Sequence, residues 1–328
     1  MQRFKIAIDT KGSDRGPKTI IKGASMALAQ NDNLELLLVG DEAEIKEECA
    51  ALGVDMSRVE ILDAKETITN YDSPATAIFE KTNSSLVKGL EALATRDDIH
   101  GFLNAGSTGA LIAGAMRYLS GKNRVRPALA AVLPSENGGF TCLVDTGATI
   151  DCTPQILLHF AKIGSAFMER MYGIENPRVG LLSNGAEETK GNKVVKEAHL
   201  LLKGDEGVNF VGNVEGNNAL SGICDVLVCD GFAGNQVLKV TEGTARRIIT
   251  DIVKYAKMTG NAQIMELVGH LMGIYDIASL GGGIILGIEK PVVKAHGSAD
   301  EKAIVSTTKM LLNMASNIEV FDRNANKL

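Results

Sequence analysis

The chain has 328 residues, of which 45% are hydrophobic and 23% are charged, and it carries a formal net charge of −6. This composition provides ample apolar surface for a folded core, which excludes an intrinsically disordered protein. The negative charge argues against a general nucleic-acid-binding surface, and no apolar run approaches the ~20 residues that a membrane-spanning helix requires.

Short apolar runs alternate with amphipathic helical patterns along most of the sequence. The runs are nearly continuous in apolar character, which is typical of strands that are buried on both faces. In chain order, the sequence predicts strands at 3–9, 34–40, 59–64, 100–106, 128–134, 140–147, 178–185, 208–214 and 225–231.

Helical patterns connect many of these strands, and they are predicted at 18–30, 42–53, 73–96, 107–120, 153–173 and 192–204. The segment 244–280 breaks the alternation and is expected to be a helical excursion before a glycine-rich return. Strand–helix alternation favours a three-layer α/β/α architecture with a largely parallel, mixed sheet. We expect residues 1–328 to form a single α/β domain of two closely packed lobes, with a weak boundary near 151–154.

The cysteines form no CxxC pair and lie mostly in apolar runs, at Cys49, Cys142, Cys152, Cys224 and Cys229. They are interpreted as reduced, buried thiols, and no zinc site is expected. The N-terminal sequence MQRFKIAIDTKG lacks the long apolar region of a signal peptide. These features predict a cytoplasmic protein, with peripheral membrane contact left open.

Polar, glycine-rich segments follow several predicted strands. In chain order they are DTKGSDRGP, NAGSTG, the DTG that begins at Asp145, NGAEETKGN, GNVEGN and CDGFAGN. The carboxyl ends of parallel strands meet at one edge of an α/β sheet, where ligands bind. Several of these segments lead directly into a helix, whose free N–H groups and positive dipole end attract anions. A phosphate-handling site is therefore predicted, although any one loop alone is equally explained as a capped turn.

Common nucleotide-binding and nucleophile motifs are absent from the sequence: there is no GxxxxGK[ST] loop, no GxGxxG after a strand and no GxSxG elbow. The histidines that lie in helix or strand patterns are interpreted as structural, namely His100, His159, His199 and His270. His296 differs, because VVKAHGS places it at the end of a strand, beside Gly297 and close to Lys294.

Taken together, the loops resemble those of the bacterial phosphate acyltransferases of phospholipid synthesis, which make acyl phosphate from acyl-[acyl-carrier-protein] and orthophosphate. The matching segments cover most of the chain in the family's order: NAGSTGAL (104–111), RPALA (126–130), NPRVGLLSNGAEETKGN (176–192), NFVGNVEG (209–216), CDGFAGNQVLKVTEG (229–243) and VVKAHGS (292–298). The family usually opens with Asp-Ala-Met-Gly-Gly-Asp, whereas this chain has DTKGSD at 9–14, with Lys11 and Ser13 as the unusual residues. Ala233 and Gln236 also stand where more apolar residues are expected.

The resemblance implies an isocitrate/isopropylmalate-dehydrogenase-like fold, a homodimer, and acyl transfer without a metal or an organic cofactor. It also implies that the acyl phosphate passes to a membrane glycerol-phosphate acyltransferase. No nucleic-acid partner is expected.

In the implied reaction, a phosphate oxygen attacks a thioester carbonyl and the carrier's thiolate leaves, so an anion must be positioned and an oxyanion stabilised. The residues proposed to take part in catalysis are Lys190, which would neutralise phosphate, Asp230, which would orient a cation or accept a proton, and Lys294 and His296, which would polarise the substrate or protonate the thiolate. The residues proposed to bind phosphate or substrate are Asp9, Gly12, Asn104, Ser107, Thr108, Gly191, Asn192, Asn213, Glu215, Gly231, Gly234 and Asn235.

Because acyl carrier proteins are acidic, docking on a negatively charged enzyme requires a local basic surface. The candidate residues are Lys122, Arg124 and Arg126 in one loop and Arg246 and Arg247 in a helix. For either group alone, an ordinary solvated charge run is the slightly favoured interpretation. The apolar residues between 264 and 272 would cover the acyl chain, pack across a dimer, or rest on a membrane, and dimer packing is the preferred interpretation.

Three alternatives remain open at the level of sequence. The nearest is a phosphotransacetylase-like enzyme that acts on a short acyl-CoA. A metal-dependent hydroxyacid dehydrogenase of the same fold would need a cluster of metal-binding aspartates, and Asp225 and Asp230 have no convincing third partner in the sequence. A catalytically silent protein that senses acyl carriers is the third, and the intact TKGN, GNVEG and DGFAGN loops count against it.

Overall fold

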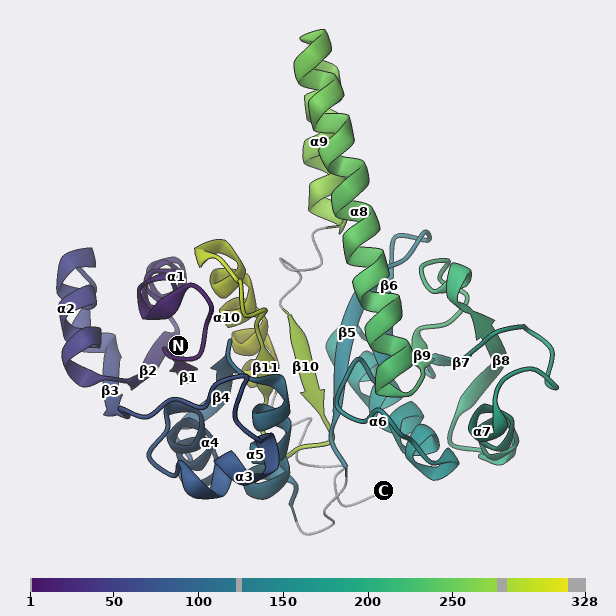
Figure 1. Ribbon diagram of the computed structural model, residues 1–328, viewed down its shortest axis with the longest axis horizontal. Helices are drawn as coiled ribbons and strands as arrows, with labels where there is room; N and C mark the ends of the chain where they lie inside the picture. The colour runs from purple at the N-terminus through teal and green to yellow at the C-terminus, as the bar shows by residue number, and fades with distance from the viewer. Residues whose placement is uncertain (1, 122–125, 276–281, 318–328) are drawn as a thin grey trace. The chain divides into compact units, whose positions relative to one another are not determined.

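The computed structural model describes residues 2–121, 126–275 and 282–317. The chain forms two compact units (Figure 1): unit 1 comprises Met1–Pro127 and Ala278–Leu328, and unit 2 comprises Ala128–Ile277. The boundary predicted near 151–154 lies inside unit 2, in the segment between a strand that ends at Val144 and a helix that begins at Pro154.

The sheet of unit 1 has the strand order β3-β2-β1-β4-β11-β10. Every described pairing is parallel except that of β10 with β11, which is antiparallel. The central strands are almost completely buried, as their continuous apolar sequences predict. The bounds are β1 (Phe4–Asp9), β2 (Leu34–Gly40), β3 (Val59–Asp63), β4 (Ile99–Asn104), β10 (Gly283–Leu286) and β11 (Val292–Lys294).

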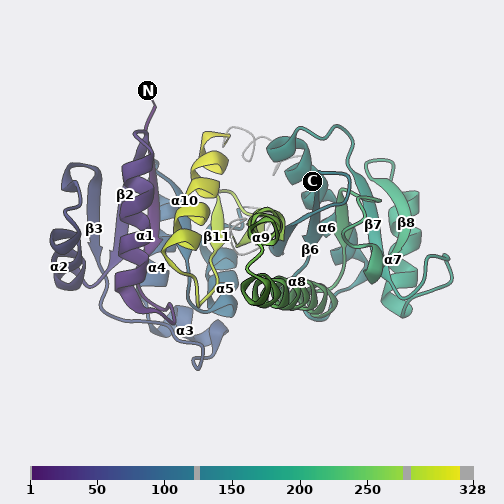
Figure 2. The same cartoon turned by 90° about the horizontal axis from the view of Figure 1, so that it is seen from above.

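Helices cover both faces of this sheet (Figures 1 and 2). One layer contains α1 (Gly16–Gln30), α2 (Glu42–Leu52) and α10 (Glu301–Ser316), and the other contains α3 (Pro74–Glu80), α4 (Ser85–Thr95) and α5 (Thr108–Leu119). A short 3-10 turn, η1 (Met56–Arg58), precedes β3. The three layers follow from apolar faces on helices that alternate with buried strands.

The sequence predicted one helix over 73–96, but the structure divides this segment into α3 and α4. The break has a local cause, because Ser84 pairs with Glu66 as an isolated β-bridge and the N–H of Ser85 donates to the Glu66 carbonyl at 3.2 Å. The Ser84 hydroxyl then caps α4 by accepting from the N–H of Val87 at 3.4 Å.

The sheet of unit 2 has the order β5-β6-β9-β7-β8, in which β5 and β6 are antiparallel and the other neighbours are parallel. Its strands are β5 (Ala128–Pro134), β6 (Phe140–Val144), β7 (Arg178–Ser183), β8 (Asn209–Glu215) and β9 (Val226–Val228). Helices α6 (Pro154–Tyr172) and α7 (Lys193–Gly204) pack together on one face, and the start of α8 (Gly231–Thr259) lies on the other. The 3-10 turn η2 (Gly216–Asn218) follows β8.

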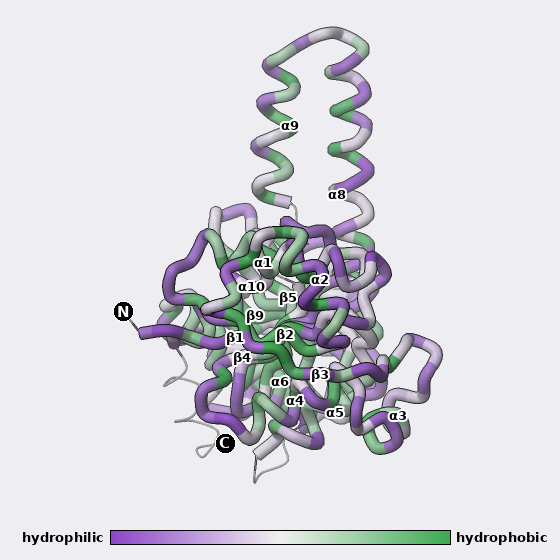
Figure 3. Tube along the Cα trace, turned by 90° about the vertical axis from the view of Figure 1, so that its left-hand side faces the viewer, coloured by the Kyte–Doolittle hydropathy of each residue, from purple (hydrophilic) through white to green (hydrophobic). Residues whose placement is uncertain are grey.

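Helices α8 and α9 (Ala262–Tyr275) form an antiparallel hairpin (Figures 1 and 3). The first turns of α8 pack on the core of unit 2, through Ala233, Val237 and Leu238. The rest of the hairpin extends away from the sheet of unit 2, and Figure 3 shows hydrophobic and hydrophilic residues alternating along both helices. The helical excursion predicted at 244–280 is confirmed up to Tyr275, although its first helix begins earlier, at Gly231; residues 276–280 lie outside the described part.

No helix within 2–121, 126–275 or 282–317 is long and apolar enough to cross a membrane.

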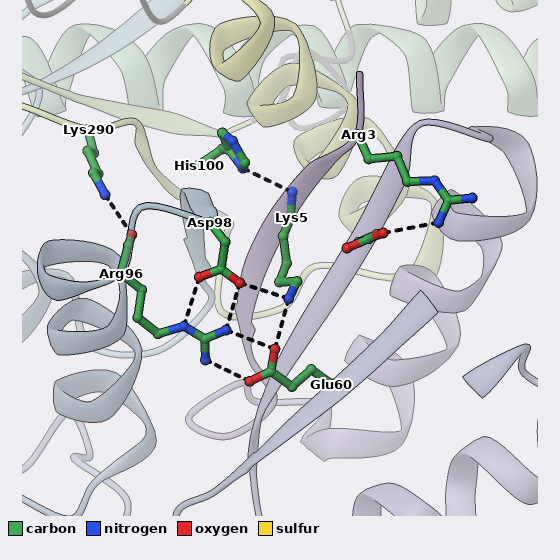
Figure 4. Close-up of polar contacts among 8 residues, drawn as sticks. Arg3, Lys5, Glu60, Arg96, Asp98, His100 and Lys290 are labelled. Carbon is green, nitrogen blue, oxygen red and sulfur yellow. Dashed lines mark hydrogen bonds and ion pairs between the residues drawn. The ribbon is translucent and has the colours of Figure 1, made fainter. Parts of the chain in front are cut away.

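A network of charged side chains joins the amino-terminal ends of β1 and β3 to the loop between α4 and β4 (Figure 4). The Arg96 guanidinium donates to both oxygens of Glu60 at 2.6 and 2.9 Å and to Asp98, while Lys5 bridges the same two carboxylates at 2.9 Å each. The hydrogen bond from Arg96 lowers the pKa of Glu60 to about 2. These ion pairs lie at the opposite end of the strands from the polar loops described next.

Candidate functional site

Three predicted site residues stand in a row at the carboxyl ends of neighbouring strands in unit 1. Asp9 ends β1, Asn104 ends β4, and Lys294 ends β11, directly opposite Asn104 in the strand register. All three are buried, with 2%, 1% and 8% of their surfaces exposed. Unit 1 therefore brings these three residues to neighbouring strand ends, and their role in binding or catalysis remains a prediction.

Asp9 and Asn104 form a direct side-chain pair. The Asn104 amide Nδ2 donates to Asp9 Oδ2 at 2.7 Å, the N–H of Lys11 donates to Asp9 Oδ1 at 2.9 Å, and the Ser85 hydroxyl also hydrogen-bonds the carboxyl group. Burial raises the pKa of Asp9 to about 6, because transfer from water destabilises the charged form more than these contacts stabilise it. The Lys294 ammonium donates to the Ala295 carbonyl oxygen.

The first loop of unit 1 packs closely against two neighbouring loops. Gly12 has a φ of +81°, and a Cβ there would lie 3.0 Å from the Gly106 Cα, so both backbone conformation and space require glycine. The Gly297 carbonyl accepts from the N–H of Asp14 at 2.9 Å and from the Ser13 hydroxyl at 3.1 Å. The unusual Ser13 thus fastens this loop to the segment that carries His296.

The other unusual residue of the first loop, Lys11, extends toward α2. Its ammonium group lies 4.0 Å from a carboxylate oxygen of Glu44. Ala233 and Gln236, which also differ from the family pattern, both lie on α8. Ala233 packs against the core of unit 2, while Gln236 is exposed. The departures from the family pattern are therefore accommodated without loss of the strand-end arrangement.

Helix α5 begins at the end of β4, beside the Asp9–Asn104 pair. Ser107 is its N-cap residue, and its hydroxyl accepts from the N–H of Ala110 at 3.5 Å. Asn104 Oδ1 accepts from the N–H of Gly106 at 2.9 Å, and Thr108 is the half-buried first residue of the helix. The positive end of the α5 dipole thus lies beside the strand ends, which favours an anion there, and the predicted phosphate role of this loop remains a prediction.

His296 lies two residues beyond the end of β11 and is exposed. Its Nδ1 accepts from the N–H of Ser298 at 3.2 Å and also lies 2.8 Å from the Ser298 hydroxyl. Because Nδ1 accepts from a backbone donor, the ring proton of the neutral imidazole resides on Nε2. In the neutral ring, Nε2–H is therefore the hydrogen-bond donor, and the catalytic role of His296 remains a prediction.

In unit 2, a buried carboxylate organises the loop after β6. The Asp145 side chain accepts from four backbone N–H groups, those of Leu129, Gly147, Ala148 and Thr149, at 2.6 to 3.1 Å. Burial nevertheless raises the pKa of Asp145 above its ordinary value. The sequence placed Asp145 at a strand end but did not include it in the site; its position before a glycine in DTGAT is the available signal for such a loop.

The start of α8 packs directly on this Asp145 loop. A Cβ at Gly231 would lie 2.8 Å from Asp145 Oδ2, and one at Gly234 would lie 1.9 Å from the Asp145 carbonyl oxygen. The N–H of Gly231 donates to Thr149 and that of Gly234 to Asp230, so in this conformation neither is available to a ligand. The two glycines therefore serve close packing of the helix on the loop.

The polar residues around these glycines also hold the loop. Asp230 is the N-cap residue of α8 and accepts from the N–H of Ala233 at 2.8 Å. The Asn235 amide Nδ2 donates to the Thr146 carbonyl at 3.1 Å. Both contacts stabilise the CDGFAGN turn, and the chemical roles predicted for Asp230 and Asn235 remain predictions.

The loop after β7 carries Lys190, whose side chain is exposed. The N–H of Gly191 donates to Asn184 Oδ1 at 2.8 Å, and Gly191 has a φ of +97°. Asn192 caps α7 by accepting from the N–H of Val195 at 2.9 Å. Lys190 thus stands two residues before the N-cap residue of α7, near the positive end of the helix dipole, and its role in anion binding remains a prediction.

Asn213 and Glu215 belong to β8, the neighbour of β7. Asn213 is buried, and both ends of its amide bond within unit 2, to His199 and to the carbonyl of Glu187. Glu215 is half-buried at the end of the strand. The strand register places Glu215 beside Ser183, at the start of the Lys190 loop.

The residues proposed for docking of a carrier protein are exposed where they are described. Arg246 and Arg247 lie on α8, and Arg247 pairs with Asp251 at 2.7 Å. Arg126 is exposed, whereas Lys122 and Arg124 lie outside the described residues. Within the described ranges, no group of three or more histidine, cysteine, aspartate or glutamate residues is arranged to hold a metal ion.

Comparison with known proteins gives the class to which this arrangement belongs. The family model described as "Fatty acid synthesis protein" matches residues 4–319. A phosphate acyltransferase of Caldanaerobacter subterraneus subsp. tengcongensis is 42% identical over 322 residues, covering 96% of this chain and 94% of that one, and one of Clostridium tetani is 40% identical over 318 residues, covering 94% of each. The class is an acyltransferase of fatty acid and phospholipid synthesis. Within that class, the chain belongs to the phosphate acyltransferase family.

Solved structures of lower sequence identity share the fold. A phosphotransacetylase from Streptococcus pyogenes has a TM-score of 0.68 at 17% identity, covering 97% of this chain and 94% of that one. A 4-hydroxythreonine-4-phosphate dehydrogenase from Burkholderia phymatum has a TM-score of 0.50 at 16% identity, covering 98% and 99%. The predicted three-layer α/β fold with a largely parallel sheet is confirmed.

Proposed function

We propose that this enzyme converts long-chain acyl-[acyl-carrier-protein] and orthophosphate to acyl phosphate and free carrier protein. The observation that carries the proposal is the match to phosphate acyltransferases at 40 to 42% identity over nearly the whole chain. An acyl donor and phosphate are the substrates that this family name states. The long acyl chain and the carrier protein are our extension of it.

Lys190 is the residue proposed to neutralise the attacking phosphate. It is exposed, it precedes the capped start of α7, and its ammonium charge adds to the positive end of that helix dipole. Phosphate oxygen is itself a competent nucleophile, so attack on the thioester carbonyl needs positioning rather than a covalent enzyme intermediate.

The leaving sulfur needs a proton, and unit 1 offers two groups for this step. Only the imidazolium form of His296 is acidic enough to protonate a thiolate, and its proton would come from that form. Lys294 is buried two residues earlier, at the end of β11. We propose that these residues protonate or stabilise the thiolate, while the start of α5 supplies N–H dipoles for an anion.

The proposed partners follow from charge and from apolar exposure. An acidic carrier protein would dock on basic residues, for which exposed Arg126, Arg246 and Arg247 are the described candidates. The exposed apolar side chains of the α8–α9 hairpin support a homodimer. We further propose a cytoplasmic enzyme that hands its product to a membrane glycerol-phosphate acyltransferase.

The direct test is phosphate-dependent consumption of palmitoyl-carrier-protein by the purified protein, with acyl phosphate trapped as hydroxamate. Acetyl-CoA is the competing donor, because a short-acyl-CoA phosphotransacetylase has the same chemistry on a different carrier. We expect the long-chain carrier thioester to be turned over with the larger kcat/KM. Faster turnover of acetyl-CoA would overturn the proposed substrate, and no phosphate-dependent product from either donor would overturn the proposed reaction.

The Lys190→Ala variant tests the phosphate site. We expect KM for phosphate to rise by at least about tenfold, as for loss of one charge-assisted contact, with little change in KM for the thioester. Lys193→Ala is a matched control, since Lys193 is an exposed lysine three positions further on whose nearest carboxylate, Glu197, lies 3.9 Å away. An unchanged phosphate KM in Lys190→Ala would remove Lys190 from this role.

A further inference from the structure

His199 is a buried polar side chain to which the proposed reaction assigns no role. It lies on α7 with 3% of its surface exposed, and its ring packs edge-on against Phe210 of β8, with the ring centroids 4.9 Å apart. Burial of an imidazole is costly unless its nitrogen atoms have partners. The partner of Nδ1 is Asn213, a residue of β8 that is proposed to bind substrate.

That partner, Asn213, fixes which nitrogen of His199 carries a proton. Asn213 Nδ2 donates to the Glu187 carbonyl at 2.9 Å, and because a carbonyl can only accept, the orientation of the amide is determined. Asn213 Oδ1 therefore faces His199 Nδ1, at 2.9 Å. Since Oδ1 can only accept, Nδ1 must be the donor.

The Glu187 carbonyl has a second donor, which is the backbone N–H of Lys190 at 3.0 Å. The buried imidazole is thus connected to the backbone of Lys190 by three successive hydrogen bonds, through Asn213 and the Glu187 carbonyl. The carboxylate of Glu188, the next residue, lies 3.9 Å from His199 Nε2 and pairs with Lys203.

Lys190 itself is seated closely on the same loop. A Cβ at Gly185 would lie 2.6 Å from Lys190 Cγ, so the aliphatic part of the lysine lies over a glycine that leaves room for it. Its neighbour Gly191 is held by Asn184. A displacement of the Glu187 carbonyl would therefore change both the backbone support and the direction of the lysine side chain.

We propose that His199 is a positioning residue, which holds the 184–192 loop through Asn213 and the Glu187 carbonyl in the conformation that presents Lys190 to phosphate. The identity of the ligand rests on the proposed function, whereas the positioning of the loop does not. His199 does not touch the reacting atoms in this scheme. It fixes a loop whose only other described backbone-directed side-chain bonds are made by Asn184 and Asn192.

Two substitutions separate the hydrogen bond from the packing of the ring. His199→Phe keeps an aromatic ring against Phe210 but removes the donor to Asn213. His199→Asn restores a donor, because an asparagine Nδ2 can occupy the position of the imidazole Nδ1. The matched control is His100→Phe in unit 1, where His100 also packs edge-on against a phenylalanine, Phe4, at 5.2 Å and uses Nδ1 for one hydrogen bond, to the N–H of Lys5.

The first measurement is amide hydrogen exchange of residues 184–192 in the full-length protein. In His199→Phe we expect these amides to exchange about tenfold faster, the order produced by loss of one buried hydrogen bond, with recovery in His199→Asn and no change in His100→Phe. Unchanged exchange in His199→Phe would overturn the positioning role, whatever reaction the enzyme catalyses.

The second measurement is the kinetics with phosphate. We expect His199→Phe to raise KM for phosphate about tenfold with a smaller effect on kcat, and His199→Asn to restore it. If exchange accelerates while KM for phosphate is unchanged, His199 positions the loop but the loop does not bind phosphate. That result would contradict the role of Lys190 in binding phosphate and not the positioning role of His199. An equal rise of KM in His100→Phe would show that loss of stability, and not the hydrogen bond to Asn213, causes the effect.

Discussion

Asp9 is a carboxylic acid that the fold buries at the end of β1, where its native pKa is about 6 against an ordinary value of 3.8. The native state therefore binds the proton more tightly than the unfolded state, and the stabilisation this gives is complete below pH 4 and is lost as the pH rises through 6. The difference corresponds to at most about 3 kcal/mol. We predict that the unfolding free energy of the wild type, relative to that of Asp9→Asn, falls by up to this amount between pH 4 and pH 7 in urea titrations.

Glu60 should show the opposite dependence of stability on pH, because its native pKa is lowered and not raised. Its native pKa is about 2 because of Arg96, so its contribution is present above pH 4.5 and is lost as the pH falls toward 2. Relative to Glu60→Gln, the wild type should therefore lose stability on acidification. If the difference in unfolding free energy between the wild type and Asp9→Asn also fell on acidification, the claim that burial raises the pKa of Asp9 would be contradicted.

At the scale of single residues, the sequence predicts which polar residues stand at strand ends, because the apolar pattern of each strand shows where that strand stops. It does not predict what those residues touch. Gly231 and Gly234 were expected to offer N–H groups to a ligand, yet both N–H groups are used within unit 2, and the glycines are required by the approach of Asp145. Such contacts join positions more than 80 residues apart, as in the 2.7 Å bond from Gly231 to Thr149, and no local pattern encodes them.

At the scale of elements, the instructive failure is the predicted helix at 73–96. Its helical propensity is continuous, but Ser84 pairs with Glu66 and then begins α4 as an N-cap residue. We predict that Ser84→Ala lowers the free energy of unfolding by about 1 kcal/mol, because the hydroxyl that accepts from the N–H of Val87 is lost. Ser73→Ala is the control: Ser73 occupies the N-cap position of α3 but makes no capping bond with its side chain. Equal losses in the two variants, measured by urea denaturation, would contradict a capping role for Ser84.

At the scale of the whole molecule, the α8–α9 hairpin leaves apolar side chains in water. Tyr255, Met258, Leu267 and Met272 are all exposed, with Met258 at 76%, whereas the first turns of α8 rest on the core of unit 2. A monomer would leave this surface uncovered, whereas a second copy that packs hairpin against hairpin would bury it. We therefore predict a homodimer, whose melting temperature rises with protein concentration because association stabilises the folded state.

Leu267→Glu tests this prediction, since it places a charge within the surface that the dimer would bury. We expect the variant to sediment as a monomer at concentrations where the wild type sediments as a dimer, and to lose the concentration dependence of its melting temperature. Glu266→Gln, at the adjacent exposed position, is the control, because it alters charge without adding it to the apolar surface. Co-sedimentation with anionic liposomes separates the alternative: if Leu267→Glu remains a dimer but no longer pellets with vesicles, the apolar surface of the hairpin contacts membrane and not a second subunit.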